Sequence, residues 1–132
     1  MRRIILFLIF CPLLAFGQAS EDKPNGFVQN QYPSGVIQSE GLMVDGEKEG
    51  LWIYYFVDGA VRSEKNYSNG LLHGSELWFH PNGQVGWQEY YVHGAAHGVF
   101  SYFDSSGNLT LKKHYVAGVE QPRYKGLLLS SN

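Results

Sequence analysis

The sequence predicts an all-β protein, an up-and-down antiparallel β-meander built from four 24-residue hairpin repeats. Three observations predict this class: glycine recurs every 24 residues, aromatic residues make up 15% of the chain, and no window follows the 3.6-residue period of an amphipathic helix. Aromatic side chains favour strands and glycine permits tight turns, so the combination is typical of hairpins. The charged fraction of 17% and the formal net charge of −2 argue against a disordered chain and against a nucleic-acid surface.

Glycine occurs at the same three positions of every 24-residue repeat, and we call these positions the glycine lattice. The four units are residues 26–49, 50–73, 74–97 and 98–121, and Pro122 stands where the next glycine would fall. We expect these glycines in turns or at strand ends, several with positive φ, because glycine adopts left-handed backbone without steric cost. The lattice glycines are Gly26, Gly35, Gly46, Gly50, Gly59, Gly70, Gly74, Gly83, Gly94, Gly98, Gly107 and Gly118.

Each unit predicts two strands and two turns. In the second unit the strands are expected at about residues 51–56 and 60–67. The turn between them is predicted to be a three-residue hairpin loop closed by a left-handed glycine, as Pro81-Asn82-Gly83 shows most clearly in the third unit. A longer turn over residues 69–74 is expected to lead into the next unit.

Strict alternation along these strands predicts one apolar face and one mixed face. Lys65, Glu89 and Lys113 fall poorly on the apolar face, and a β-bulge would resolve this misfit. The predicted apolar face carries Ile53, Tyr55, Val61, Tyr67, Leu77, Phe79, Val85, Trp87, Tyr91, Phe103, Leu109, Leu111 and Tyr115. The predicted mixed face carries Trp52, Tyr54, Arg62, Glu64, Asn66, Glu76, Trp78, Gln88, Tyr90, Phe100, Tyr102, Lys112 and His114.

Aromatic residues of the mixed face form the candidate binding surface. A row of exposed rings along the repeat direction would offer a platform for sugar rings, lipid headgroups or a partner protein. The alternative is that these rings stabilise a thin sheet through cross-strand pairs. The candidate residues are Trp52, Tyr54, Trp78, Tyr90, Phe100 and Tyr102.

The repeating unit resembles a known family. Gly-x-Trp-x-Tyr-Tyr-x-x-Asp-Gly at residues 50–59, and Tyr-x-Asn-Gly-x-x-His-Gly at 67–74 with its copy at 91–98, are similar to the MORN repeat in its bacterial variant form. The resemblance covers residues 26–121 and implies a single-layer antiparallel sheet used for binding or scaffolding, with lipid or protein partners. Proteins of this kind are often labelled YwqK-type antitoxins. That label would suit only a chain that stays in the cytoplasm with its toxin.

The first seventeen residues predict a secretory signal peptide. Arg2-Arg3 precedes an apolar run, and Ala15-Phe16-Gly17 supplies small residues for cleavage before Gln18. The apolar run is shorter than the ~20 residues that span a bilayer, so we expect cleavage rather than an anchor, and no transmembrane segment afterwards. Cleavage would remove Cys11, the sole cysteine, and lower the net charge from −2 to −4. Residues 18–25 are expected to be a short linker.

Sequence features that would carry chemistry are weak. His93-x-x-x-His97 has a metal-like spacing, but these residues flank a turn and no cysteine could add a ligand after cleavage. No nucleophile elbow or phosphate loop occurs, so no catalytic, cofactor-binding or metal-binding residue is predicted and no cofactor is expected. Residues 122–132 are expected to form a final edge strand or a cap.

These observations together predict an exported, non-catalytic binding or scaffold module, either periplasmic or secreted. Another protein is the expected partner, bound through the sheet. A glycan or a lipid headgroup bound by the aromatic row is the alternative, and an antitoxin-like role remains the alternative for a chain that is not exported.

Overall fold

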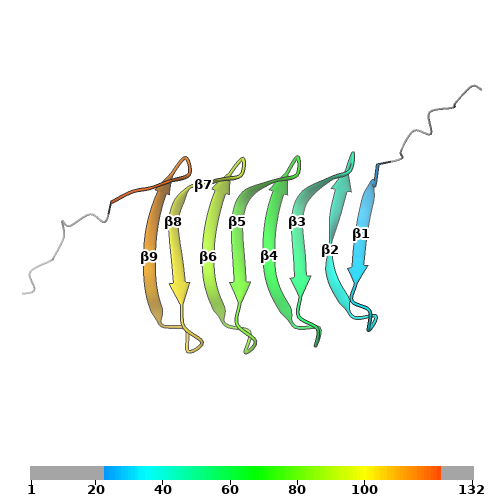
Figure 1. The fold of residues 1–132 in the computed structure, drawn as a ribbon, viewed down its shortest axis with the longest axis horizontal. Helices are drawn as coiled ribbons and strands as arrows, with labels where there is room; N and C mark the ends of the chain where they lie inside the picture. Colours follow the sequence, from blue (N-terminus) through cyan, green and yellow to red (C-terminus); the bar gives the residue numbers. More distant parts are fainter. Residues whose placement is uncertain (1–22, 123–132) are drawn as a thin grey trace, which may run out of the picture.

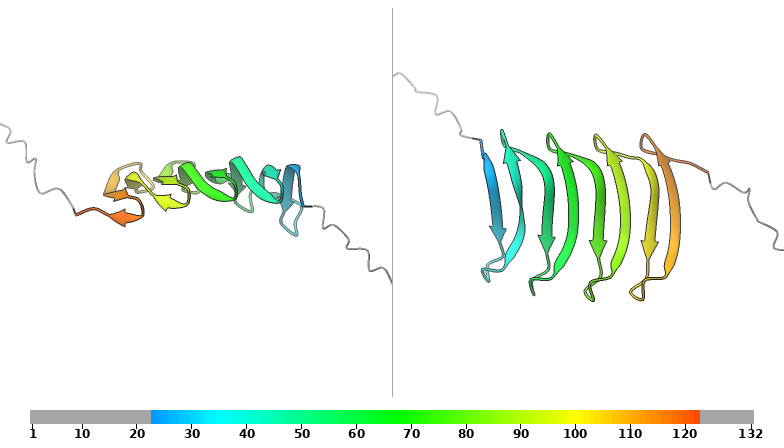
Figure 2. Two further views of the ribbon diagram at one scale, coloured as in Figure 1. Left: turned by 90° about the horizontal axis from the view of Figure 1, so that it is seen from above. Right: turned by 180° about the vertical axis from the view of Figure 1, so that it is seen from behind.

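The computed structural model describes residues 23–122 and shows one open antiparallel sheet of ten strands. Hairpins stand side by side along the long axis in a single thin layer, with β1 at one end and β9 at the other (Figures 1 and 2). The prediction of an all-β meander is confirmed. The predicted signal peptide, residues 18–22 of the linker and residues 123–132 of the predicted edge strand lie outside the described residues.

Consecutive strands are neighbours throughout the sheet. The order is β1 to β6, then β8, β9 and β10, while the short β7 pairs with β6 where the chain enters β8. The strands are β1 (Gly26–Gln31), β2 (Ile37–Val44), β3 (Glu47–Tyr55), β4 (Val61–Ser68), β5 (Leu71–Phe79), β6 (Val85–Val92), β7 (Ala95–Ala96), β8 (Gly98–Phe103), β9 (Leu109–Val116) and β10 (Val119–Glu120).

Three-residue loops join the two strands of each repeat at one edge of the layer. In the third repeat the His80 amide donates to the Gln84 carbonyl at 2.8 Å, and the Gly83 amide donates to the His80 carbonyl at 2.8 Å. Gly83 has a φ of 84°. The predicted loop over residues 81–83, closed by a left-handed glycine, is therefore confirmed.

Two-residue turns join successive repeats at the opposite edge. Asp45, Asn69, His93 and Ala117 lie 24 residues apart and all have φ between 47° and 50°, and each precedes a lattice glycine that is also left-handed. Two consecutive residues with positive φ define the type I′ turn, which matches the twist of antiparallel strands. The connection is thus tighter than the predicted turn over residues 69–74.

All twelve lattice glycines have positive φ, whereas Gly41 and Gly86, which lie off the lattice, do not. The predicted left-handed backbone is therefore confirmed. Their placement needs one correction, because Gly50 and Gly74 lie inside β3 and β5. The pairing of β4 with β5 changes register between Lys65 and Tyr67, opposite Gly74, so this glycine forms a bulge within a strand.

A second bulge follows each three-residue loop and changes the faces. Phe79 pairs with Val85 but Trp78 pairs with Trp87, so Gly86 is left without a partner. In the second repeat Tyr55 pairs with Val61 but Tyr54 pairs with Ser63, so Arg62 is left without a strand partner. The residues passed over are Gln38, Arg62, Gly86 and Thr110, again 24 apart.

The bulge makes the predicted face assignment wrong beyond each loop. A slip of one residue moves the whole remaining strand to the other face, because side chains alternate with a period of two. Tyr67 pairs with Gly50 and therefore shares a face with Trp52. Seven further residues predicted on the apolar face join the same side as Trp52, namely Trp87, Tyr91, Leu111, Tyr115 and the misfitting Lys65, Glu89 and Lys113. Glu64, Asn66, Gln88, Tyr90, Lys112 and His114 are separated from it. Arg62, the bulged residue, stays beside the Trp52 side, with its guanidinium carbon 6.0 Å from the Tyr54 ring centroid.

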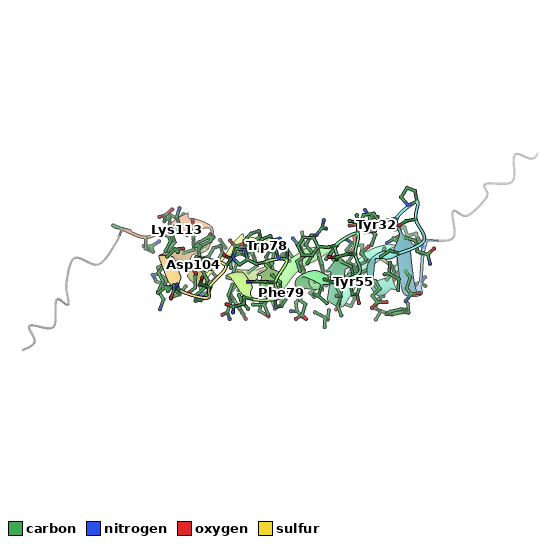
Figure 3. All side chains as sticks on the ribbon, turned by 90° about the horizontal axis from the view of Figure 1, so that it is seen from below. Tyr32, Tyr55, Trp78, Phe79, Asp104 and Lys113 are labelled. Atoms are coloured by element: carbon green, nitrogen blue, oxygen red, sulfur yellow. The ribbon has the colours of Figure 1, made fainter. Side chains whose placement is uncertain are left out.

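We call the side that holds Trp52, Glu76, Trp78 and Phe100 the packed face. Figure 3 shows Trp78 and Lys113 on this side of the layer and Tyr55 and Phe79 on the other. The packed face contains the buried apolar side chains of the described chain: Trp52 is 1% exposed and Phe100 is 4% exposed. A single-layer sheet thus builds a shallow core by laying large rings across its strands.

Candidate binding face

The side opposite the packed face, which we call the open face, carries the exposed apolar residues of the sheet. Eleven large apolar side chains are exposed among the described residues, and ten of them lie in strands, all on the open face. The eleventh, Val57, lies in a loop. The ten are Phe27, Leu42, Val44, Leu51, Leu71, Tyr90, Val99, Leu109, Val116 and Val119.

The exposed apolar side chains are distributed unevenly between the two faces of the sheet. Single exposed apolar residues are common on proteins, but contiguous apolar patches mark interaction sites. The exposed residues of the open face extend from β1 to β10, at intervals set by the repeat. Gln88, Lys112 and His114 lie among them, so apolar and polar side chains are interspersed along the face.

The predicted aromatic row does not form one exposed surface. Trp52 and Phe100 are buried, and Tyr54, Trp78 and Tyr102 are half-buried on the packed face. Tyr90 lies on the open face, opposite Ser75, and is 44% exposed. Of the six candidates, then, Tyr90 alone belongs to the exposed apolar surface.

Trp52 lies at the centre of a cation–π cluster. The Lys48 Nζ lies 4.6 Å from the Trp52 ring centroid and 5.1 Å from those of Tyr54 and Tyr67, and it donates to the Tyr54 hydroxyl at 2.6 Å. The Trp52 Nε1 donates to the Leu42 carbonyl at 3.0 Å. Because the chain's own lysine fills this aromatic cage, the rings act as core here and are not available to an outside cation.

Tyrosine hydroxyls of the packed face have partners inside the protein. The Tyr54 and Tyr67 oxygens lie 3.1 Å apart, and burial together with this hydrogen bond raises the pKa of Tyr67 to about 12. Glu89 accepts from Tyr91 at 2.7 Å and from Tyr102 at 2.9 Å. Burial, reinforced by these bonds to the carboxylate, raises the pKa of both phenols. The packed face therefore uses its polar groups to fix its own rings.

One polar cluster ties the open face across the first three strands. Glu40 accepts from the Tyr55 hydroxyl and from the Gln29 side chain, the latter at 2.7 Å. The bond to Tyr55, followed by that to Gln29, lowers the pKa of Glu40. The same bond raises the pKa of Tyr55 to about 12. This cluster fixes β1 and β3 against β2.

Hollows of the described sheet are shallow and open to solvent. One, of about 390 Å³, is lined on the open face by Val85, Gln88 and Phe103 with residues of the adjoining loops. The other, of about 560 Å³, follows the outer edge of β9 beside Leu111, Lys112 and Pro122. Polar side chains of the second hollow include His114, Lys113 and Glu120, and Lys113 donates to Glu120 at 3.0 Å.

His93 and His97 are not predicted as a metal site in spite of their spacing, and β7 separates His97 from the turn of His93. Instead, the His93 ring is tilted by 48° against that of His73, with ring centroids 4.7 Å apart, and the His93 amide donates to His73 Nδ1 at 3.3 Å. Glu49 and Asn25 make the equivalent contact with the amides of Asn69 and Asp45. Histidine 73 thus has a turn-capping role. Over residues 23–122, no three His, Cys, Asp or Glu side chains converge as a metal site would require.

The repeated hairpins have a counterpart among known protein families. Three stretches match the MORN repeat variant. The matched residues are 48–69, 72–85 and 96–117, and each stretch includes strand residues and one of the three-residue loops described above. MORN repeats are generally binding or scaffold modules and generally non-catalytic.

No curated protein matches the chain. In the part of the chain that the structure describes, no helix has the length and apolar character needed to cross a membrane.

Proposed function

We propose that this MORN-type protein is an exported scaffold that binds another protein through its open face. The observation that carries the proposal is that, within residues 23–122, every exposed large apolar strand residue lies on that one face. A flat sheet side of this kind suits a protein partner that presents its own apolar surface, because burial of such residues contributes roughly 25 cal/mol per Å².

Protein is favoured over the alternative ligands for two reasons. The rings that would stack on sugars are held in the packed face by hydrogen bonds and by Lys48. A chain cleaved before Gln18 would have a net charge of −4, which opposes binding to anionic lipid headgroups. An antitoxin role in the cytoplasm is not part of the proposal, because the first seventeen residues predict export.

Single charged substitutions on the open face test the binding proposal. Leu51→Asp and Val99→Asp change residues that are 48% and 53% exposed, so the fold should persist while a carboxylate is forced into the contact. Affinity capture from the exported fraction should lose the partner by at least about tenfold with each variant. Val57→Asp is the matched control, because Val57 is 70% exposed in a loop outside the face.

Capture that is equal in all three variants would overturn the proposed surface. Binding to a glycan array or to neutral lipid vesicles, lost on Trp78→Ala and kept in Leu51→Asp, would support the alternative ligand. The export proposal has its own test: N-terminal sequencing of the protein recovered outside the cytoplasm should begin at Gln18 or within a few residues.

A further inference from the structure

The two edges of the sheet are protected to different degrees. An edge strand exposes unpaired backbone groups, and proteins usually guard such edges with charges, proline or a covering segment. At the β9 end, Lys112 and Lys113 lie in the edge strand, and β10 pairs with Val116 and Tyr115. At the other end β1, with the sequence GFVQNQ, contains neither charge nor proline.

Strand β1 is also almost fully accessible. Five of its six residues are exposed, and Phe27 is 66% exposed, the highest value among the apolar strand residues of the described chain. Its one strand neighbour among residues 23–122 is β2. An uncharged, accessible edge strand with an exposed phenylalanine is suited to pairing with a second strand.

Successive residues of a β-strand direct their backbone N–H and C=O groups to opposite sides of the strand. This alternation decides which β1 residues could form hydrogen bonds with a further strand. Along β6, the Tyr90 carbonyl points away from β5 and accepts from His97 at 2.8 Å. Leu42 in β2 is the equivalent of Tyr90 two repeats earlier, so its backbone carbonyl points away from β1. The adjacent residue Gly41 therefore points its backbone N–H and C=O groups towards β1, where it is paired with Val28. The backbone groups of Phe27, Gln29 and Gln31 therefore point away from β2.

We propose that two copies of this chain pair antiparallel through their β1 strands. A twofold axis through Gln29 would place Gln29 opposite its own copy and Phe27 opposite Gln31 of the second copy. All three residues lie on the open face, as antiparallel partners must share a face. The result is a closed isologous dimer with a continuous twenty-stranded sheet, in which the two open faces form one surface.

The sequence of β1 explains why this register is preferred. Phe27 would cover the aliphatic part of Gln31 from the second copy, and six backbone hydrogen bonds would satisfy the exposed edge. On the packed face, Val28 would stand opposite Asn30 of the second copy, in a non-hydrogen-bonded pair where side chains lie closest. No like charges meet at any of these positions.

Removing one outward amide tests the proposal. Gln29→Pro deletes the central N–H of the interface, while the pairing of β1 with β2 keeps its donors. Gln29→Ala removes the same side chain, including its bond to Glu40, but keeps the amide, so it is the matched control. Lys112→Pro makes the equivalent change at the β9 edge. Sedimentation of the processed protein should show a dimer for the native chain, Gln29→Ala and Lys112→Pro. Gln29→Pro should weaken dimerisation at least about tenfold.

A cysteine pair tests the register even where Gln29→Pro fails to fold. In a Cys11→Ser background, Val28→Cys with Asn30→Cys should form a disulfide-linked dimer under mild oxidation, while Val28→Cys alone should remain largely reduced. A native chain that is monomeric at about 100 μM would overturn the proposal. So would a dimer that persists in folded Gln29→Pro, a dimer lost with Lys112→Pro, or absence of the paired cysteine cross-link. A monomeric native chain would overturn only the pairing through β1, because the Leu51→Asp and Val99→Asp variants test the open face independently.

Discussion

The indole of Trp52 lies directly on Gly41 of the neighbouring strand, and a Cβ at Gly41 would overlap three atoms of the ring. Gly86 has the same relation to Trp78, which also stacks on Trp87 with centroids 4.4 Å apart. These two glycines have no positive φ, so they are required for space and not for backbone freedom. The twelve lattice glycines all require left-handed backbone, and a Cβ on six of them, Gly26, Gly35, Gly50, Gly59, Gly83 and Gly98, would meet nothing within 4 Å.

Gly41→Ala should therefore destabilise the fold although alanine suits a strand better than glycine does. The methyl group would push the Trp52 ring off the sheet and strain its bond to the Leu42 carbonyl, with an expected loss of about 2–3 kcal/mol. Urea unfolding followed by tryptophan fluorescence measures this loss. Val44→Ala, at an exposed position in the same strand, should stay within about 0.5 kcal/mol, and an equal loss in both would show that the contact is unimportant.

Gly83→Val should destabilise through the backbone alone. Gly83 has a φ of 84°, and nothing lies within 4 Å of a Cβ built on it, so the expected loss of roughly 1–3 kcal/mol is strain. Gly83→Asn should cost clearly less, because asparagine tolerates the left-handed region. At Gly41 asparagine should bring no such relief compared with valine, since the side chain of either residue would meet the Trp52 ring. Thermal unfolding of valine and asparagine variants at both glycines tests the two requirements. The same advantage of asparagine over valine at Gly41 as at Gly83 would contradict them.

The repeat, the strands and the three-residue loops could be predicted because each depends on local sequence. Glycine at fixed spacing and Pro81-Asn82-Gly83 determine turns within a few residues. The face assignment failed because the bulge at Arg62, Gly86 and Thr110 inserts one residue just after each loop. These three residues share no chemical type, so no residue pattern marks the bulge.

A signal of the bulge was nonetheless present in the sequence. Lys65, Glu89 and Lys113 fitted poorly on an apolar face, and a one-residue slip places each of them on the packed face with a partner. Lys65 pairs with Glu76, Glu89 accepts from two tyrosines, and Lys113 donates to Glu120 at 3.0 Å. The open face could not be predicted before the slip was known, because it combines first-strand and second-strand residues across that bulge.

The Lys65–Glu76 ion pair should behave as part of the core. Glu76 is 5% exposed, and the side chain of Lys65 is 28% exposed. Lys65→Met would leave the carboxylate buried without its cation, so we expect a loss of about 2 kcal/mol, below the range for fully buried pairs because water reaches the lysine. The double variant Lys65→Met with Glu76→Leu should recover most of that loss. Additive losses in a double-mutant cycle would show that the pair does not interact.

Alkaline pH should weaken the packed face. The pKa of Tyr67 is raised to about 12 from the ordinary value of about 10, so the fold favours the protonated phenol. This contribution is fully present below about pH 10 and is lost as the pH rises from 10 towards 12. The Tm should fall over that interval, and less steeply in Tyr67→Phe, which cannot ionise there. Equal slopes for the native chain and Tyr67→Phe would show that this phenol is not buried as described.

Site-specific photo-crosslinking tests the central claim, that the open face binds a protein, most directly. A benzophenone amino acid placed at Tyr90 reports on the open face, and one placed at Lys113, whose side chain is 34% exposed, reports on the packed face. In cells that export the protein, irradiation should give a discrete adduct with another protein from position 90 and none from position 113. An adduct from position 113 alone, or none from either position, would contradict the proposed binding surface.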